Sequence, residues 1–373
     1  MRLLARYLLR ECLVALGFCF SAFLVFWIAS DLVTNLSSMQ ESKMRGTDIA
    51  AYYFFMLPDF LPIAIPVALL LALLYALTNH ARYNEITAIR AAGVSLWRIS
   101  LPYFGIAIFC AASLFLLNEY IAPISAERAE EVKNSRLPAR SGVNPRIKKN
   151  LVFTNSREGR AWHIGAYDKE NGNMSHVALE WQLRDGTVRS IFAQYGTYSN
   201  RVWTFRNVRE MRRASGMGSV HVKSETNLMV LPDLSETPEI IRSEISIAER
   251  FSNQGRTRSA DIPLRVIRNY IRLHPNPERS MQRWLSSKWH GRFAGPATCL
   301  VVVLLAIPFS AGSGRRNVFV GVAASLGIFF AYHILQQIGF AFGEAGHVPT
   351  WFGAWFPNLL AAGAGLLMLA RVR

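Results

Sequence analysis

The segment RYNEITAIRAAG, residues 82–93, separates two apolar segments, Tyr52–Leu77 and Ile99–Ile121. A helix needs about 20 predominantly apolar residues to cross roughly 30 Å of hydrocarbon, and both neighbours reach that length. The chain contains four further segments of the same kind, at Leu13–Thr34, Phe293–Ala311, Val318–Phe342 and Phe352–Leu369. The sequence therefore predicts six membrane-spanning helices, three before a long polar middle segment and three after it.

The quoted segment is itself predicted to be a short helix rather than a loop. Asn84 can cap its start, Glu85 suits the positive N-terminal end of a helix, and Gly93 suits its stop. Ile86 and Ile89 are three positions apart, which places both apolar side chains on one helical face. Two uses of such a helix stay open. It is either an amphipathic connector that lies on the lipid surface or a docking helix that a cytosolic partner binds and moves.

Positively charged residues are distributed unevenly among the short segments outside the predicted spans. Segments on the same side of the membrane as the N-terminus contain ten Lys or Arg, whereas the two short loops on the other side contain only Lys43 and Arg45. Because cytoplasmic loops are enriched in Lys and Arg, this difference sets the orientation. Both termini and the segment 82–93 are predicted to be cytoplasmic, and the polar middle segment lies on the opposite side.

The polar middle segment has the pattern of a β domain. From Asn150 onward it contains short runs of β-branched and aromatic residues, separated by turn signals such as Asn171-Gly172-Asn173. Regular spacing of short strands favours a sandwich, barrel or jelly roll. The predicted fold class is an α-helical membrane protein with six transmembrane helices and an inserted all-β, jelly-roll-like domain. The predicted domains are 1–124 with spans one to three, 125–260 with the strands, 261–292 as a helical linker, and 293–373 with spans four to six.

Cysteine content and motif searches exclude several classes of function. The four cysteines, Cys12, Cys19, Cys110 and Cys299, lie in or beside apolar spans, so the β domain has neither a disulfide framework nor a metal–thiolate site. Neither a metal-like histidine spacing nor a nucleophile triad occurs, so we expect no catalytic residue, metal or cofactor. The nearest approach to the phosphate-binding motif G-x-x-x-x-G-K-[ST] is Gly312–Arg316, which lacks the lysine. Any ATP hydrolysis must therefore take place on another protein.

Most of the formal net charge of +16 belongs to the polar middle segment. Nucleic acid is not an expected partner on that side of the membrane. The charge favours anionic lipid or a phosphorylated glycolipid as the partner. The alternative is a well-solvated basic surface without a specific ligand.

Several short motifs occur in an order and spacing that resemble one known family. They are RYLLRE (6–11), LP to IP (57–66), EITAIRAAG (85–93), YIAP (120–123), LLAIP (304–308), QIG (337–339), VP (348–349) and WFPN (355–358). Over nearly its whole length the sequence resembles the permease subunits of the lipopolysaccharide export ABC transporter, the LptF/LptG family. Asp31 and the QIG motif resemble the LptG member slightly more.

The resemblance implies a role for the helix 82–93. In that family the corresponding helix couples the permease to a cytosolic ATPase, which implies that Glu85, Ile86, Ile89, Arg90 and Gly93 form the coupling site. The implied partners are a second permease subunit in a heterodimer, a dimeric cytosolic ABC ATPase and a periplasmic bridge protein that accepts lipopolysaccharide. A single-span accessory protein is a further implied partner. The implied location is the bacterial inner membrane, with the β domain in the periplasm.

The resemblance also implies a path for the lipid, through a cavity lined by spans one and five and then to the β domain. Candidate contacts to lipid phosphates are the basic residues just outside the spans, although each could equally be an ordinary surface residue: Lys43, Arg45, Lys133 and Arg136. Members of the LptG kind can carry a basic residue in the outer part of span one. This chain has none there, so the resemblance does not extend to a phosphate contact at that place. Candidate gate residues are the polar side chains within spans one and five, for which hydrogen bonding between helices is the alternative: Asp31, His333, Gln336 and Gln337.

Three other functions are compatible with the sequence. The first is an ABC permease for another lipid or for a lipoprotein, whose binding would not depend on lipid phosphates. The second is a membrane-anchored periplasmic binding or scaffold protein that transports nothing. The third, an ion-driven carrier, is disfavoured because the centres of the predicted spans lack an acidic relay.

Overall fold

The computed structural model of the chain describes residues 2–42, 44–134, 147–155, 158–183, 186–213, 220–252, 262–274, 277–311 and 318–371. It divides into two compact units. The first, here called the helical unit, comprises residues 1–137, 258–264 and 283–373. The second, the β unit, comprises residues 138–257 and 265–282.

Among the described residues, six helices are long and apolar enough to cross a membrane, in agreement with the six predicted spans. The observed helices extend beyond the predicted apolar segments at both ends, because polar residues continue the helices past the hydrocarbon-length core. These helices are α1 (Arg2–Glu41), α2 (Gly46–Arg82), α4 (Leu96–Leu116), α8 (Arg279–Ala311), α9 (Val318–Ala345) and α10 (Thr350–Arg371).

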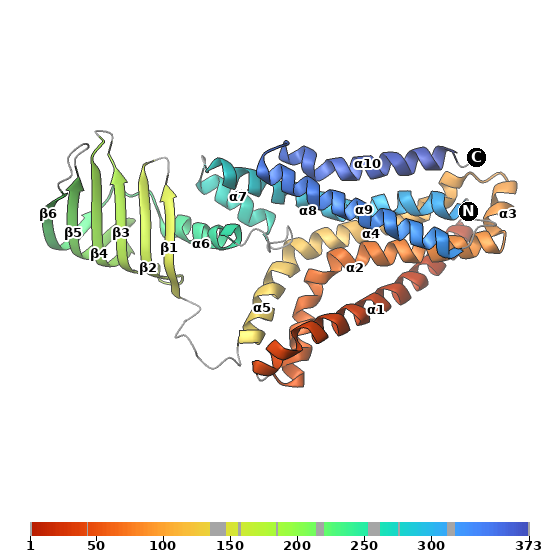
Figure 1. Cartoon of the computed structure of the whole chain (residues 1–373), viewed down its shortest axis with the longest axis horizontal. Helices are drawn as coiled ribbons and strands as arrows, with labels where there is room; N and C mark the ends of the chain where they lie inside the picture. Colours follow the sequence, from red (N-terminus) through yellow and green to blue (C-terminus); the bar gives the residue numbers. More distant parts are fainter. Residues whose placement is uncertain are drawn as a thin grey trace. The chain divides into compact units, whose positions relative to one another are not determined.

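Three shorter elements complete the first half of the helical unit. They are α3 (Glu85–Ala91), a π-helical turn η1 (Leu117–Ile121) that continues α4, and α5 (Ala122–Asn134). Figure 1 shows α3, the start of α1 and the end of α10 at the same end of the long helices, with α5 at the other end. The start of α1, the end of α10 and α3 are therefore at one end of the bundle.

The spans differ strongly in how much of their apolar surface the chain itself covers. In the most apolar 18-residue window, 72% of the residues are buried in α2 and in α8. The corresponding shares are 11% for α1 and 22% for α9. The core of the helical unit accordingly centres on α2 and its neighbours, with Leu69, Leu70 and Leu73 packed against Tyr103 and Val302. Within the chain, the residues of α1 and α9 are therefore mostly exposed or half-buried, which leaves apolar surface for lipid or another protein.

In its described residues, the β unit forms an antiparallel sheet of six strands that lie in chain order. The predicted strands are confirmed, and their bounds are β1 (Ile147–Asn155), β2 (Arg160–Asp168), β3 (Met174–Gln182), β4 (Val188–Ser199), β5 (Val202–Arg213) and β6 (Val220–Leu231). In the β4–β5 hairpin, a two-residue turn sets where one strand ends and the next begins. Asn200 and Arg201, with φ of 54° and 65°, connect the paired residues Ser199 and Val202. Two successive positive φ angles give the type I′ turn that suits twisted strands.

Helix α6 (Pro238–Ser252) packs on one face of this sheet. Its Ile241 and Ile245 join a core that includes Trp162, Trp203 and Phe205, all at most 3% exposed. Large aromatic side chains such as Trp162 and Trp203 can line a groove for acyl chains or fill a core. The structure assigns both to the core.

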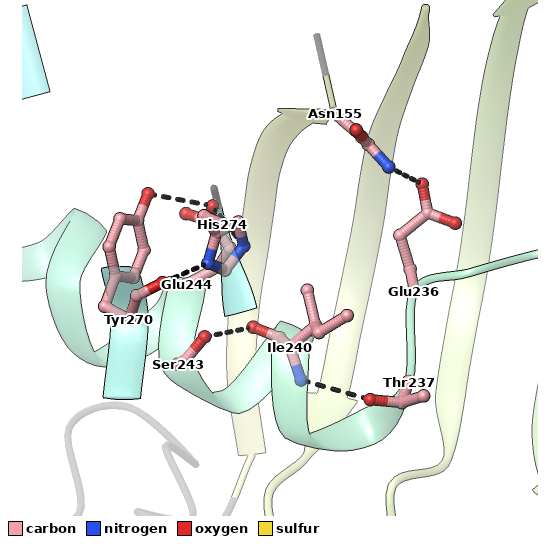
Figure 2. A network of polar contacts seen from close by, with 8 residues as sticks. All are labelled: Asn155, Glu236, Thr237, Ile240, Ser243, Glu244, Tyr270 and His274. Carbon is pink, nitrogen blue, oxygen red and sulfur yellow. Dashed lines mark hydrogen bonds and ion pairs between the residues drawn. The ribbon is translucent and has the colours of Figure 1, made fainter. Parts of the chain in front are cut away.

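Polar contacts fasten α7 (Leu264–Leu273) to α6 (Figure 2). The Tyr270 hydroxyl donates to Glu244 at 3.0 Å, and His274 Nε2 lies 3.0 Å from the same oxygen. Burial raises the pKa of Tyr270, and the charge of Glu244 acts in the same direction, so the hydroxyl stays protonated and donates. On the apolar face of α7, Ile267 and Tyr270 are buried, whereas Ile271 is exposed.

Candidate functional site

Helix α3 begins and ends through backbone conformation rather than side-chain capping. Asn84 occupies the predicted N-cap position with φ of 59°, but its side chain makes no capping bond. Asparagine tolerates this left-handed conformation better than most residues. At the other end, the N–H of Gly93 donates to Arg90 at 2.9 Å and that of Val94 donates to Ile89 at 3.3 Å. With Gly93 at φ of 84°, these two bonds form a Schellman motif, as the predicted stop requires.

Replacing Gly93 by alanine is expected to loosen the end of α3. Space is not limiting, since nothing lies within 4 Å of an added Cβ, but the positive φ costs a residue with a side chain about 1–2 kcal/mol. Amide hydrogen exchange of Gly93→Ala in the full chain should therefore be faster at positions 93 and 94. Gly17→Ala is the matched control, because Gly17 also has open space but lacks a positive φ. Equal exchange in the two variants would contradict the assigned motif.

The Glu85 carboxylate faces two side chains from neighbouring helices. Its Oε2 lies 2.8 Å from Nδ1 of His80, near the end of α2. The hydroxyl of Tyr7, on α1, donates to the carboxylate with 3.3 Å to each oxygen. The side chain of Glu85 is 34% exposed, so these contacts leave part of the carboxylate open to solvent.

His80 connects this carboxylate to a second one. The residue is 1% exposed, and its Nε2 lies 3.4 Å from Oε2 of Glu11 on α1. The ring of Tyr7 meets the imidazole edge-on, with 5.5 Å between ring centroids. Tyr7, Glu11, His80 and Glu85 therefore form one cluster, here called the polar bridge, that joins α1, α2 and α3. Tyr7 and Glu11 belong to the RYLLRE motif, whose role was not predicted.

The apolar residues of α3 face inward. Ile86 is 6% exposed and Ile89 packs against the same core of the helical unit. Both were predicted to belong to the coupling site, and the structure places them where they anchor the helix to the bundle. Arg90 is half-buried and lines a crevice of ≈ 450 Å³ together with Gly93 and Trp97. The exposed side of α3 consists of small side chains, namely Thr87, Ala88, Ala91 and Ala92.

The predicted phosphate contacts are only partly within the described residues. Lys43 and Arg136 lie outside them. Lys133 belongs to α5, and Arg45 is exposed at the N-cap of α2, where its backbone N–H donates to Asp48 at 3.0 Å. These residues are on separate elements.

The predicted gate residues have different environments. Asp31 accepts a hydrogen bond of 3.0 Å from Tyr53 of α2, which ties α1 to its neighbour. Gln336 is 5% exposed and donates to the Tyr332 hydroxyl at 3.3 Å. His333 stacks on Phe329, and Gln337 is exposed on α9.

Tyr332 extends this contact into a network across three helices. Its hydroxyl lies 2.8 Å from Thr298 of α8 and donates to Asn358 of α10, whose amide nitrogen donates to Ala294 at 3.0 Å. For Gln336, hydrogen bonding within this bundle accounts for its burial. Of the four predicted gate residues, Gln337 is exposed, Asp31 and His333 are half-buried, and Gln336 is buried.

A buried ion pair at the π-helical turn was not predicted. Arg292 of α8 is 2% exposed, donates to the Asn118 carbonyl and lies 3.7 Å from Glu119. Glu119 also accepts the backbone N–H of Leu264 at 2.9 Å. Isolated π-helical turns often mark functional positions in helices. The available signal was the glutamate at the end of span three and an arginine just before span four, and their pairing requires the fold.

A groove of ≈ 720 Å³ lies on the β unit, over β3 to β6. Its lining mixes apolar side chains such as Phe192 and Met211 with polar ones such as Asn207 and Arg209. Phe192 is 39% exposed and lines this groove. Mixed linings of this kind suit an amphipathic ligand.

Glu210 of β5 gives the β unit a predictable response to acid. Burial raises the pKa of this carboxyl, but two hydrogen bonds of 3.1 Å from Arg189 and one of 3.0 Å from Arg212 outweigh it, so the pKa is lowered from 4.5. A carboxylate whose pKa is lower in the folded than in the unfolded state stabilises the fold at pH values above its unfolded-state pKa. This stabilisation is lost as the pH falls through the folded-state pKa.

We therefore expect the free energy of unfolding of the β unit to fall as pH decreases below about 4.5. The Glu210→Gln variant should lose this part of the pH dependence, as measured by hydrogen exchange of the strand amides in the full chain. Identical pH profiles for wild type and variant would contradict the assignment.

The comparisons with known proteins agree with this architecture. The family described as lipopolysaccharide export system permease LptF/LptG matches residues 6–371, almost the entire chain. The chain belongs to the LptF/LptG family. A search of curated proteins found no match. The chain is therefore a multi-pass inner-membrane permease subunit for lipopolysaccharide export, and the predicted resemblance is confirmed. The family includes both LptF and LptG, so the assignment to LptG stays a prediction.

Membership also sets the chain's general role. LptF/LptG proteins are permease subunits of an ABC export complex that contains a partner permease, and the chain is a transport subunit rather than an enzyme in its own right. Among the described residues, no group of three or more His, Cys, Asp or Glu could hold a metal ion.

Proposed function

We propose that the chain is one half of a heterodimeric exporter that extracts lipopolysaccharide from the inner membrane, driven by a dimeric cytosolic ABC ATPase that binds α3. The observation that carries this proposal is the geometry of α3. The helix is anchored to the bundle by Ile86 and Ile89, exposes small side chains outward and holds a partly exposed carboxylate at its start. A rigidly anchored helix with an open outer face can transmit force from a protein that binds it.

The second permease packs against α1 and α9 in this proposal. These two spans bury 11% and 22% of their apolar windows within the chain, far less than α2 or α8. A cavity between two permeases, lined by these spans, would expose apolar surface to the acyl chains of the lipid. A single-span accessory protein would insert beside α1.

The β unit receives the lipid on the periplasmic side and passes it to a bridge protein. The groove over β3 to β6 supplies the mixed apolar and polar lining that an acylated glycolipid requires. Basic residues near the membrane surface, among them Arg45, would contact the lipid phosphates. Both termini and α3 are then cytoplasmic, in keeping with their position at one end of the helices (Figure 1).

Co-purification tests this proposal. The tagged wild-type chain is isolated from membranes in mild detergent, and bound proteins and lipids are identified by mass spectrometry. The expected result is a cytosolic ATPase, a second six-span permease and lipopolysaccharide. Recovery should fall when the lipid lacks its phosphates.

Other outcomes identify the alternatives. Recovery of the ATPase with a different lipid or a lipoprotein, and equal binding of phosphate-free lipid, would indicate an ABC permease of other specificity. Recovery of a ligand without any ATPase would indicate a membrane-anchored binding protein.

A further inference from the structure

The polar bridge contains more contacts than are needed to cap a short helix. Glu85, at the start of α3, is held by His80 of α2 and by Tyr7 of α1, and His80 also faces Glu11 of α1. The Nδ1 of His80 makes the hydrogen bond to Glu85, whereas its Nε2 faces Glu11 at 3.4 Å without a hydrogen bond. His80 is 1% exposed, whereas the side chains of Glu11 and Glu85 are 32% and 34% exposed. The histidine is thus the buried centre of the cluster, and the carboxylates are its rim.

We propose that Tyr7, Glu11 and His80 are positioning residues that attach α3 to the N-terminal end of α1. Through them, a displacement of α3 is transmitted to α1. This inference rests on the proposed role of α3 as the site where the ATPase binds. It assigns to the start of the chain a function in coupling.

The length of α3 makes this attachment necessary. Isolated helices shorter than about 12–15 residues are marginal in water, and α3 has seven residues. Its position therefore depends on contacts with the rest of the helical unit. The packing of Ile86 and Ile89 joins it to a core that includes Leu8 of α1, and the polar bridge adds a direct polar contact to α1.

Contacts further along α1 explain why it can respond as one body. In its middle, Phe23 and Trp27 stack on Phe60 of α2, with ring centroids 5.6 Å and 4.1 Å apart. Further toward the other end, Asp31 accepts the hydroxyl of Tyr53. Helix α1 is continuous over 40 residues, and it is the least covered of the six spans. A displacement of the N-terminal end of α1 therefore reaches the part of the helix that faces lipid or a partner.

The first test measures coupling in the complete transporter, reconstituted in proteoliposomes with lipopolysaccharide. His80→Leu removes both contacts of the imidazole, and Tyr75→Leu, on the exposed side of the same helix, is the matched control. We expect His80→Leu to keep the ATPase bound and hydrolysing ATP while lipid released per ATP falls on the order of tenfold. Tyr75→Leu should match wild type. Unchanged release per ATP in His80→Leu would overturn the inference.

The second test separates positioning from general support of the fold. If Glu11 acts through His80, Glu11→Gln should lower lipid released per ATP on its own but add nothing in the His80→Leu background. Additive losses would show that Glu11 acts independently and would overturn the proposed chain of contacts. Loss of the ATPase from the His80→Leu complex, with hydrolysis and release falling together, would assign His80 to the shape of the docking site instead.

The third test does not require an ATPase, so it stands even if the proposed function fails. In the full chain in lipid nanodiscs, His80→Leu should speed amide exchange across 85–91 on the order of tenfold relative to wild type and Tyr75→Leu. Exchange that is unchanged would mean that the polar bridge does not hold α3, whatever drives the transporter.

Discussion

Glu85→Lys is expected to weaken binding of the cytosolic ATPase by roughly 10- to 150-fold and to stop ATP-driven release of lipid. A hydrogen bond to a charged group contributes about 1.5–3 kcal/mol, and the partly exposed carboxylate of Glu85 is the charged group that α3 offers to a partner. Lysine at this position removes the acceptor for His80 and Tyr7 and places a cation beside the imidazole. It therefore affects both the outer contact and the polar bridge.

The measurement is a titration of the purified ATPase onto the permease in nanodiscs, followed by release assays. Glu180→Lys is the control, since it reverses an exposed carboxylate on β3. Glu85→Gln keeps the size and an acceptor oxygen, and its affinity should lie between those of wild type and Glu85→Lys. If Glu85→Lys and Glu180→Lys both bind the ATPase like wild type, α3 is not the docking site.

Arg160→Met is expected to destabilise the β unit by about 3–5 kcal/mol. Arg160 and Glu236 are 2% and 1% exposed and are joined by an ion pair of 2.9 Å. Glu236 also accepts from Asn155 at 2.7 Å (Figure 2). Its backbone carbonyl accepts the indole N–H of the core residue Trp203 at 2.6 Å. Removing the arginine leaves a buried carboxylate without its counter-charge.

A matched control exists in the same sheet. Arg209 and Glu225 form a pair with a similar distance, 2.8 Å, but their side chains are 57% and 64% exposed. Arg209→Met should cost less than about 1 kcal/mol, because exposed pairs contribute little. Hydrogen exchange of the strand amides in the full chain gives both values. Equal costs for the two variants would contradict the importance of burial at Arg160.

Much of the fold could be predicted because its signals are local in sequence. Hydropathy over about 20 residues predicts a span, and a run such as Val188–Tyr195 between turn residues predicts a strand, whatever the rest of the chain does. The stop of α3 at Gly93 is predictable for the same reason. The ends of the helices beyond the apolar segments were harder to predict, because polar residues are compatible both with a continued helix and with a loop.

The contacts between elements could not be predicted, because they depend on the register between helices. His80 lies beside Glu11 and Tyr7 only because α1 packs along α2 in one particular register. The pairing of Arg292 with Glu119 depends in the same way on α8 meeting the π-helical turn. The inward direction of Ile86 and Ile89 was also open. A single apolar face suits packing against the bundle as well as binding of a partner.

The most direct test of the central claim is release of lipopolysaccharide from proteoliposomes that contain this chain, its partner permease and the ATPase, with a periplasmic acceptor outside. The account predicts that release requires hydrolysable ATP and this chain, and that a non-hydrolysable nucleotide gives none. Release that continues without this chain or without hydrolysis, or hydrolysis that never releases lipopolysaccharide, would contradict it.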